Sequence, residues 1–537
     1  MNLGLNSGQV RQFFLYGVIG CTSAFIDFLL FTLMYILAFL PFVIVAVKNL
    51  ANPNFWYDES GQFWMALGLN HFSPPLSQRG GLADVIINNM GYNLDPGGFT
   101  VILHYWTLIS SSPVWLRTLP FLFFLVSVIF LWRIAYRFTN NSCLALGVAV
   151  LIPFWVSNGY VHYAFELRAY SMNYCGVIVS VFLLMRYFEN QNRLNIFLFN
   201  LAMSFFIFSR YSFIITAFSL SVVVLIYNRK DIVHFIKKYI FSYIPLVISA
   251  LIVVFMGLKR NSGIAPSYVL DLLLSGKGWY DTIRIVISVL FSPYSGVILC
   301  LAVFWGVLRI RKSNAYLKVE ALLIAIVIEH CIFFALSLSG RHPWGYESRW
   351  DIDLRTLSLI SAVIVMAYLV NHYVQLPEKL VAQGLSHNLP IWINRLFLLT
   401  RKYAFFVCIS CTCLLPLIGE RGYVPNDYLY TILKDSNLAL DGKRIFVPYY
   451  SKPTVKYIFE YTDFKNQLDN YKSFVFESED GRIYKKKIYC DEFDYIFFSH
   501  VTVDEYKKKL IGDYTLLIDS PLKNSTGILR CYHKLNP

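Results

Sequence analysis

Two adjacent carboxylates, Asp58 and Glu59, lie in the aromatic stretch NFWYDESGQFW (residues 54–64), directly after the first long apolar run. A carboxylate at the boundary between lipid and water can accept a proton from a hydroxyl group while that oxygen forms a new bond. Asp58 is therefore a candidate general base, with Glu59 orienting either Asp58 or the hydroxyl-bearing substrate. We expect the neighbouring aromatic side chains at the same boundary, namely Phe55, Trp56, Tyr57, Phe63 and Trp64.

Further ionisable side chains lie on short connections between apolar segments. The segment FELRAYS (residues 165–171) contains Arg168, and Arg210 stands between two apolar runs. Arg341 and Arg349 lie in SGRHPWGYESRW (residues 339–350). Guanidinium groups form strong hydrogen bonds with phosphate oxygens, so these four arginines are candidates for holding a phosphate group. The remaining active-site candidates are Glu166, Asp95, His104 and Tyr170.

The composition places these residues in a membrane protein. Of the 537 residues, 56% are hydrophobic and 15% are charged, and the mean hydropathy is +0.51. Apolar blocks of roughly 17 to 25 residues are long enough to cross, as helices, a hydrocarbon core about 30 Å thick. The net charge of +14 comes from Lys and Arg in short clusters between these blocks. Such clusters are typical of cytoplasmic connections and do not indicate nucleic-acid binding.

Eleven membrane crossings are predicted. The first lies within residues 13–47, and the others lie near 115–137, 142–160, 171–188, 195–209, 211–228, 240–258, 285–308, 319–338, 356–374 and 403–418. Basic clusters fall on alternate connections, which are therefore predicted to be cytoplasmic. The candidate arginines then lie on the outer side, against the usual bias, so they need an anionic partner such as a lipid headgroup.

The composition divides the chain into four parts. Residues 1–47 hold the N-terminal segment and the first transmembrane helix, and residues 48–114 form an extracytoplasmic loop with membrane-surface helices. Residues 115–418 form the transmembrane bundle. Frequent Lys, Asp, Glu and Tyr after Glu420 indicate a soluble extracytoplasmic α/β domain over residues 419–537. Strands are predicted there at 444–450, 473–478, 494–500 and 514–520, with a helix at 504–512.

These residues suit one reaction. A sugar joined to a polyprenyl phosphate already has a good leaving group, because the phosphate carries its charge without a proton. Arginines can hold that charge as it develops, and Asp58 can take the proton of the acceptor hydroxyl. We therefore expect an inverting displacement at the anomeric carbon of a lipid-linked sugar.

Four motifs resemble the GT-C superfamily of membrane glycosyltransferases over roughly residues 24–375. They are the DE pair after the first crossing, LDPGGF (residues 94–99), WLRTLPFLF (115–123) and FELRAYS (165–171). The similarity is greatest to the branch that contains protein O-mannosyltransferases and the lipid A aminoarabinose transferase. Many members of that branch have two prolines where this chain has Pro96-Gly97-Gly98.

The resemblance implies a GT-C fold and a multi-pass enzyme of the inner (cytoplasmic) membrane that acts on its periplasmic side. Its donor would be a polyprenyl-phosphate sugar and its acceptor a glycan or a lipid-linked molecule among the membrane lipids. The family's catalytic aspartate corresponds to Asp58, and its phosphate-binding arginines correspond best to Arg168 and Arg349, followed by Arg210 and Arg341. Some members use a divalent metal, to which Asp58, Glu59 and Glu166 could contribute ligands, and others use none.

A second resemblance concerns the acceptor. Residues 10–37, VRQFFLYGVIGCTSAFIDFLLFTLMYIL, are similar to the opening helix of GtrA-type proteins, which are implicated in O-antigen modification. This similarity favours lipopolysaccharide, O-antigen or another surface glycan as acceptor. Two alternatives remain open: a polysaccharide polymerase or ligase, and a non-enzymatic flippase or transporter of lipid-linked sugars.

Two ionisable sites lie inside predicted crossings. Asp27 and the pair Glu329-His330 are costly in lipid, so we expect them to face the interior of the bundle. They can be a structural pair or part of a proton relay.

Overall fold

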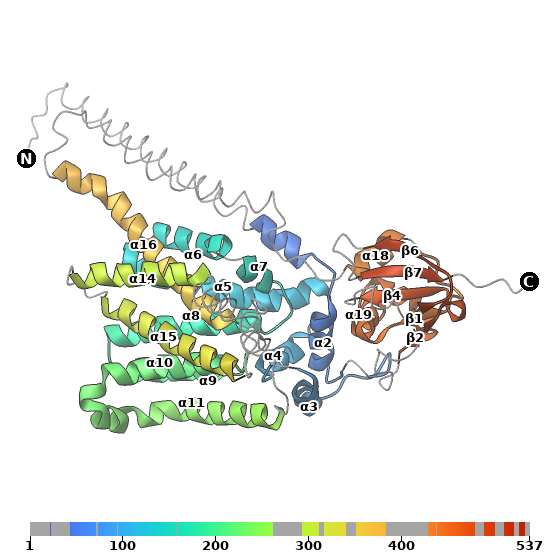
Figure 1. Cartoon of the computed structure of the whole chain (residues 1–537), viewed down its shortest axis with the longest axis horizontal. Coiled ribbons are helices and arrows are strands. Elements are labelled where there is room, and N and C mark those ends of the chain that lie inside the picture. The colour runs from blue at the N-terminus through green and yellow to red at the C-terminus, as the bar shows by residue number, and fades with distance from the viewer. Residues whose placement is uncertain are drawn as a thin grey trace, which may run out of the picture. The chain divides into compact units, whose positions relative to one another are not determined.

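Long apolar helices form the larger part of the computed structural model (Figure 1). The structure describes residue 22 and residues 43–70, 73–93, 95–156, 158–260, 293–310, 316–339, 351–382, 428–436, 438–477, 488–499, 510–519 and 526–531. The chain divides into two compact units, one of residues 1–48 and 369–422, the other of residues 49–368 and 423–537. In the first unit, residues 43–48 and 369–382 are helical. Apart from residues 369–382, which end helix α16 (Ile352–Ala382), the elements below belong to the second unit.

Five helices among the described residues are long and apolar enough to cross a membrane: α5 (Pro113–Thr139), α8 (Tyr170–Glu189), α11 (Ile232–Arg260), α15 (Tyr316–Leu338) and α16 (Ile352–Ala382). Shorter helices accompany them: α6 (Ser142–Val156), α7 (Asn158–Tyr163), α9 (Arg193–Phe206), α10 (Phe213–Tyr227), η1 (Arg229–Asp231) and α14 (Pro293–Ile310). Helix α5 packs on α6 and α8, α8 packs on α9, and α9 packs on α11. Helices α10 and α14 both pack on α15.

Over the described residues, the crossings predicted between residues 115 and 374 are helical: the one at 142–160 divides into α6 and α7, and residues 285–292 of the one at 285–308 lie outside the described residues. Helix α11 exposes large apolar side chains, with Phe241 78% and Phe255 69% exposed, as a lipid-facing helix requires. Helix α8 is instead buried along most of its length. The predicted crossing at 403–418, and most of the one within 13–47, lie outside the described residues. The count of eleven therefore stays a prediction.

Three short helices precede the bundle: α2 (Tyr57–Ala66), α3 (Leu82–Tyr92) and α4 (Gly98–Trp106). The turn before α4 requires glycine. Gly97 has a φ of +103°, and a Cβ atom there would lie 2.6 Å from Asn89 Nδ2. A Cβ atom on Gly98 would lie 2.6 Å from Phe208 Cβ, and the Gly98 amide donates to the Phe208 carbonyl at 2.9 Å. This close approach ties the start of α4 to the connection after α9.

The C-terminal residues form a five-stranded mixed sheet in the order β2-β1-β4-β7-β6. Its strands are β1 (Ile445–Val447), β2 (Val475–Phe476), β4 (Tyr495–Ser499), β6 (Tyr514–Asp519) and β7 (Thr526–Cys531). Strand β1 runs parallel to β2 and β4, whereas β7 runs antiparallel to β4 and β6. Strands β3 (Ile488–Tyr489) and β5 (Leu510–Ile511) form a separate parallel pair. The four strands predicted from the sequence contain β1, β2, β4 and β6, but the first was predicted to extend too far, because Tyr449 and Tyr450 belong to the turn η2 (Tyr449–Ser451).

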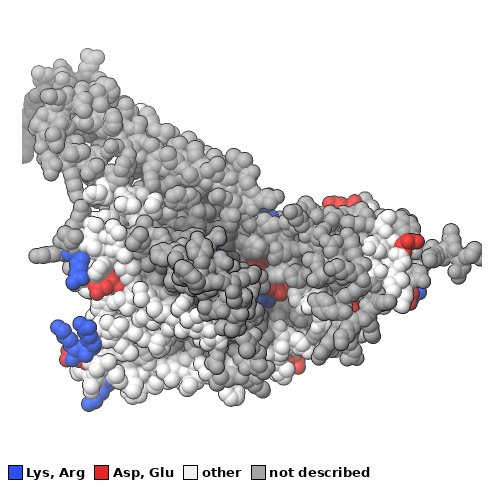
Figure 2. Space-filling view, in the orientation of Figure 1, with Lys and Arg blue, Asp and Glu red and all other residues white. Residues whose placement is uncertain are grey.

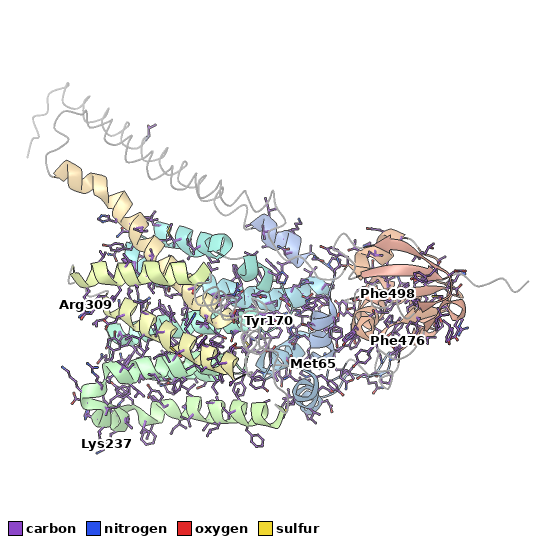
Figure 3. The ribbon with its side chains drawn as sticks, in the orientation of Figure 1. Met65, Tyr170, Lys237, Arg309, Phe476 and Phe498 are labelled. Atoms are coloured by element: carbon purple, nitrogen blue, oxygen red, sulfur yellow. The ribbon has the colours of Figure 1, made fainter. Side chains whose placement is uncertain are left out.

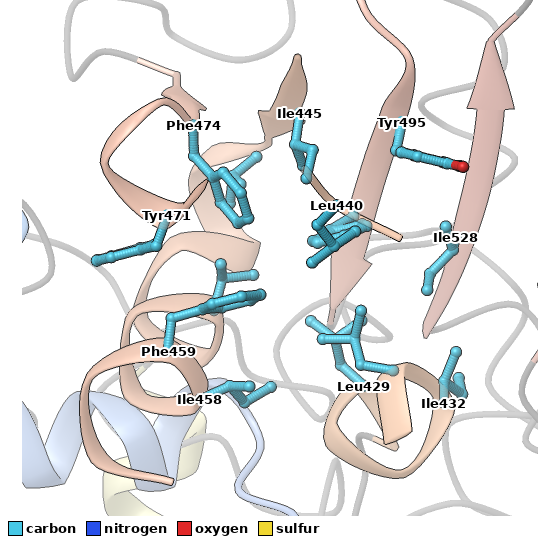
Figure 4. Packing of buried hydrophobic residues seen from close by; sticks show 14 of the residues in the cluster. Leu429, Ile432, Leu440, Ile445, Ile458, Phe459, Tyr471, Phe474, Tyr495 and Ile528 are labelled. Carbon is cyan, nitrogen blue, oxygen red and sulfur yellow. The ribbon is translucent and has the colours of Figure 1, made fainter. Parts of the chain in front are cut away.

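Helices cover this sheet: α18 (Leu429–Ser436), α19 (Lys452–Tyr461) and α20 (Leu468–Lys472), with the short turns η2 (Tyr449–Ser451), η3 (Asp463–Gln467) and η4 (Cys490–Glu492). Figure 4 shows the buried core between them, in which Leu429, Ile458 and Phe459 of the helices face Ile445 and Ile528 of the strands. The helix predicted over 504–512 is wrong at its end, because Leu510–Ile511 is strand β5. Pairing with Ile488 and Tyr489 there overrides the local helical pattern. Residues 504–509 lie outside the described residues.

Helix α19 packs on α2, and this contact changes the interpretation of the aromatic stretch. Phe63 and Trp64 are completely buried rather than placed at a lipid–water boundary. The ring of Tyr457 lies 5.0 Å from that of Phe63 and 4.6 Å from that of Phe55. Trp64 Nε1 donates to the Pro453 carbonyl at 3.0 Å. The prediction that these rings face a membrane surface is therefore wrong for Phe55, Phe63 and Trp64, because the C-terminal residues cover them.

A buried lysine in this contact predicts a pH dependence of stability. Lys456 Nζ donates to the Ser73 carbonyl at 2.9 Å and lies 4.1 Å from the centre of the Trp64 ring. Burial, opposed by Glu460 and assisted by Lys452, lowers the pKa of Lys456 to about 8. An unfolded chain keeps the lysine proton up to about pH 10.4, so the unfolded state binds more protons between these values. Stability should therefore rise with pH from 8 towards 10, by roughly 1 to 3 kcal/mol.

The measurement is the thermal unfolding of the detergent-purified protein at pH 7.5, 9 and 10. In Lys456→Met this part of the pH dependence should disappear, because the variant has no proton to release. Identical pH profiles for the two proteins would contradict the assignment.

Candidate functional site

Helix α2 carries Asp58 and Glu59 in its first turn, where carboxylates are favoured by the positive end of the helix dipole. Successive residues of a helix point about 100° apart, so the two carboxylates face different surroundings. Glu59 is completely buried, whereas Asp58 is half-buried. The structure thus separates two acids that are adjacent in the sequence.

Glu59 forms a buried ion pair with Arg117 of α5. Arg117 Nη1 lies 2.7 Å from Glu59 Oε1, and both side chains are fully shielded from solvent. The Leu167 amide also donates to Glu59 Oε1 at 2.8 Å, and Arg117 Nη1 donates to the Phe165 carbonyl at 2.6 Å. Arg117 Nε donates to the Asn52 carbonyl at 3.1 Å. The pair therefore fastens α2, α5 and the connection that carries Arg168 to one another.

Asp95 lies between the guanidinium groups of Arg168 and Arg210. Asp95 Oδ2 is 3.9 Å from Arg168 Nη2, and Asp95 Oδ1 is 3.6 Å from Arg210 Nε. Arg168 Nη1 approaches the main-chain oxygen of Asp58 at 3.5 Å. The two guanidinium carbons lie 5.8 and 4.6 Å from the centre of the Tyr170 ring. We call Asp95, Arg168, Tyr170 and Arg210 the arginine cluster, and it lies beside Asp58.

Arg168 remains charged although it is buried. Burial lowers its pKa, but the nearby Asp58, Tyr170, Asp95 and Glu166 raise the pKa by more, so it lies above the usual arginine value. Arg168 Nε is buried and donates no hydrogen bond to a described residue. Buried polar atoms in folded proteins generally have a hydrogen-bond partner, so we expect Arg168 Nε to have one that the described residues do not supply.

Nearby acids also keep Arg210 charged although it is buried. Burial and repulsion by Arg168 lower its pKa, but Asp95, Tyr170 and Asp353 outweigh them and raise it. Asp353, in the first turn of α16, accepts from Asn173 Nδ2 at 2.7 Å, and Asn173 accepts from Ser209 Oγ at 2.9 Å. The sequence analysis missed Asp353 as a site residue. The sequence feature that could have indicated Asp353 is an acidic residue in the first turn of an otherwise apolar helix.

Four buried polar side chains set the position of the Asp95 segment. Asn89 Nδ2 donates to the main-chain oxygen of Asp95 at 2.9 Å, and Asn89 Oδ1 accepts from Thr100 Oγ1 at 2.6 Å and from Asn93 Nδ2 at 2.8 Å. Gln62 of α2 bridges the same residues: it donates to Thr100 Oγ1 at 2.7 Å and accepts from Asn93 Nδ2 at 3.1 Å. The helix that carries Asp58 is thereby fixed to the loop that carries Asp95.

Of the other two candidates, Glu166 borders the arginine cluster, because its main-chain oxygen accepts from the Arg168 amide at 2.7 Å, whereas His104 lies apart from the cluster. Glu166 is buried, and its Oε2 lies 3.3 Å from His162 Nε2. His104 Nδ1 lies 2.8 Å from the carbonyl of Ala66, the last residue of α2, whereas Asp58 lies in the first turn of that helix. Arg79 Nη2 donates to the His104 carbonyl at 2.6 Å. The structure therefore brings His104 to the opposite end of α2 and not to Asp58.

The remaining expectations concern metals, other arginines and charges in the bundle. Arg341, Arg349 and Asp27 lie outside the described residues. In the part of the chain that the structure describes, no three His, Cys, Asp or Glu residues are grouped as metal ligands. Glu329 is completely buried in α15 and accepts from Thr216 Oγ1 at 3.2 Å, so it faces the interior of the bundle as expected.

Comparison with known proteins finds likeness only in structure. No protein-family model and no curated protein sequence matches the chain. Among solved structures, it is similar to ArnT from Cupriavidus metallidurans bound to undecaprenyl phosphate, with 11% identity, a TM-score of 0.47, and coverage of 93% of this chain and 97% of that one. It is also similar to the archaeal oligosaccharyltransferase AglB from Archaeoglobus fulgidus, in complex with an inhibitory peptide and a dolichol-phosphate, with 12% identity and a TM-score of 0.41.

That second match covers 81% of this chain and 64% of the oligosaccharyltransferase, so the chain spans less than two thirds of its length.

Proposed function

We propose that this protein is an inverting membrane glycosyltransferase that moves a sugar from a polyprenyl-phosphate carrier to a hydroxyl group of a surface glycan, such as lipopolysaccharide or O-antigen. The observation that supports this is the half-buried Asp58 next to the buried, charged Arg168, which shares Asp95 with the second buried arginine, Arg210. A base and a phosphate-binding cation pair are the two groups that such a transfer requires.

In the proposed reaction, the acceptor oxygen attacks the anomeric carbon and Asp58 accepts the proton of that hydroxyl. The bond between the anomeric carbon and the phosphate oxygen breaks, and the phosphate keeps the bonding electrons. Arg168 and Arg210 hold the charge that grows on the phosphate. Arg168 Nε is buried and donates to no described residue, so a phosphate oxygen can accept a hydrogen bond from this N–H group. A single displacement inverts the configuration at the anomeric carbon.

An apolar groove suits the hydrocarbon chain of the carrier. A groove of about 540 Å³ lies between α10 and α11, and its lining is almost entirely apolar. Ile207 and Ile214, on either side of Arg210 in the sequence, are part of that lining. A carrier with its phosphate at Arg210 would therefore find apolar surface for its prenyl units directly beside it.

The charge distribution supports placing this site on the outer side of the cytoplasmic membrane. Helix α8 starts at Tyr170 in the arginine cluster and ends at Glu189, where Arg137 and Lys318 pair with that carboxylate. Lys237 and Arg309 are also at the end of the bundle away from the C-terminal sheet (Figure 3), where Lys and Arg gather in the space-filling view (Figure 2). Under the positive-inside rule that basic end is cytoplasmic.

Binding of the carrier tests the arginines. Arg168→Gln and Arg210→Gln should each weaken binding of polyprenyl phosphate about 10- to 100-fold, since each removes a charge-assisted contact with phosphate. The measurement is the titration of nanodisc-embedded protein with polyprenyl phosphate, with thermal unfolding as a check of folding. Arg137→Gln, at the other end of α8, is the matched control and should bind normally. Equal affinities for all four proteins would refute the assignment of the phosphate site.

The same preparation tests the reaction class. With a polyprenyl-phosphate sugar and lipopolysaccharide or another extracted surface glycan, wild-type protein should form labelled glycan and free carrier phosphate. A flippase or transporter would bind the carrier and move it across the bilayer without forming either product.

A further inference from the structure

Three strands of the C-terminal sheet end at the same edge. Because β1, β2 and β4 are parallel, the residues that follow or finish them lie together: Tyr449 and Tyr450 after β1, Glu477 after β2, and Ser499 at the end of β4. The Tyr449 amide donates to Glu477 Oε2 at 2.9 Å, and the Ser499 amide donates to Ser451 Oγ at 2.8 Å. We call the half-buried Tyr449, Tyr450 and Glu477 the carboxyl edge. In sheets with parallel strands, ligands commonly bind beyond this edge.

The carboxyl edge lies next to the residue that precedes Asp58. The ring of Tyr450 is 5.5 Å from the ring of Tyr57 at an angle of 69°, and the ring of Tyr449 is 5.4 Å from that of Tyr450 at 90°. All three tyrosines are half-buried. Three aromatic rings from two parts of the chain therefore meet beside the proposed base.

The charges around Tyr57 agree with this arrangement. Burial raises the pKa of Tyr57, and Tyr449, Asp58 and Tyr450 raise it further, against a lowering by Arg168. The phenol of Tyr57 therefore keeps its proton at neutral pH and can donate a hydrogen bond.

The chemistry of these groups fits a sugar ring. One face of a pyranose exposes C–H groups, which pack against aromatic rings, while its hydroxyl groups pair with carboxylate and phenol groups. We propose that the carboxyl edge, with Tyr57, binds the acceptor sugar residue whose hydroxyl group is presented to Asp58. This inference rests on the proposed transferase function and adds the binding site for the acceptor.

The geometry of displacement favours the acceptor over the donor sugar. In an in-line displacement the attacking oxygen approaches the anomeric carbon from the side opposite the leaving phosphate. The phosphate is assigned to Arg168 and Arg210, which lie on connections of the bundle, whereas Tyr449 and Tyr450 come from the C-terminal sheet. The two substrates are thus assigned to different elements, with Asp58 adjacent to both.

Substitution of Tyr450 tests this site. Tyr450→Leu keeps an apolar side chain but removes the ring, so the KM for the glycan acceptor should rise about tenfold. The kcat at saturating acceptor should stay within about threefold. Tyr450→Phe, which keeps the ring, should have nearly the wild-type KM. Tyr489→Leu is the control, because Tyr489 is an exposed tyrosine in β3 of the same region.

The readout is transfer of labelled sugar from a polyprenyl-phosphate donor to lipopolysaccharide, with KM measured separately for the two substrates. An unchanged acceptor KM in Tyr450→Leu would overturn the inference, and so would a rise confined to the donor KM, which would assign the rings to the donor sugar. Either result leaves the transferase function standing. Absence of transfer by the wild-type protein to any acceptor would instead remove the proposed function itself.

Discussion

Asp58→Asn should reduce sugar transfer about 10²- to 10⁴-fold, which is the range that a positioned general base contributes. The amide occupies nearly the same volume as the carboxylate but cannot take the proton of the acceptor hydroxyl. Binding of polyprenyl phosphate should stay within about threefold of wild type, because the arginines assigned to the phosphate are unchanged. The measurement is product formation from a polyprenyl-phosphate sugar at saturating donor and acceptor.

The control for this variant is Asp435→Asn, which alters an exposed acid in α18 and should transfer normally. Asp58 is half-buried, so the variant should fold, and its melting temperature should match that of wild type within a few degrees. Transfer within about threefold of wild type by Asp58→Asn would show that another group acts as the base.

We expect the substitution Glu59→Gln to lower the stability of the fold and not to act directly on the rate of sugar transfer. Arg117 would keep its charge in a site that solvent does not reach, and breaking a buried pair on one side costs about 3 to 5 kcal/mol. We therefore expect a large fall in the melting temperature and in the yield of monodisperse protein. Glu189→Gln is the matched control: Glu189 pairs with Arg137 at a partly exposed position, where such a pair contributes about 1 kcal/mol or less.

The measurement is thermal unfolding of both variants in the same detergent. The Glu59→Gln protein could instead be as stable as Glu189→Gln but inactive with saturating substrates. That result would indicate that Glu59 takes part in the reaction by orienting Asp58 or the acceptor.

The parts of the fold that depend on local pattern were predictable from the sequence. Apolar runs long enough to cross a membrane coincide with helices between residues 113 and 382, and alternating apolar segments coincide with β1, β2, β4 and β6. Strand β5 was not predictable, because the sequence around Leu510 has a helical pattern and its partner, β3, lies about twenty residues earlier. The pairing depends on a contact that no local window contains.

The candidate site divides in a similar way. Arg168 and Arg210 were selected because cations on connections predicted to be outer run against the usual bias, and the structure brings them together with two further candidates, Asp95 and Tyr170. Their roles stay predictions until the variants are measured. His104 was selected for its chemistry, but it is placed at the other end of α2 by its bond to Ala66.

The buried ion pair formed by Arg117 was not predicted from the sequence. Arg117 lies in WLRTLPFLF, at the start of an apolar helix, where a cation usually marks a membrane boundary. Its partner is Glu59, 58 residues away, and its remaining donors bind main-chain carbonyl groups, which no sequence pattern records. The sequence offered one hint: the proposed chemistry needs only one of the two acids Asp58 and Glu59, which leaves Glu59 available as a partner for Arg117.

The contact between α2 and α19 has a consequence for how proteins of this architecture can evolve. Phe63 and Trp64 are shielded by Tyr457, Tyr461 and Pro453, which are almost four hundred residues later in the chain. Recombination that exchanged the C-terminal sheet for an unrelated one would expose those rings to water and disturb the helix that bears Asp58. Residues 55–64 and 453–461 should therefore be inherited as a matched set, and new acceptors should arise by point substitution at the carboxyl edge.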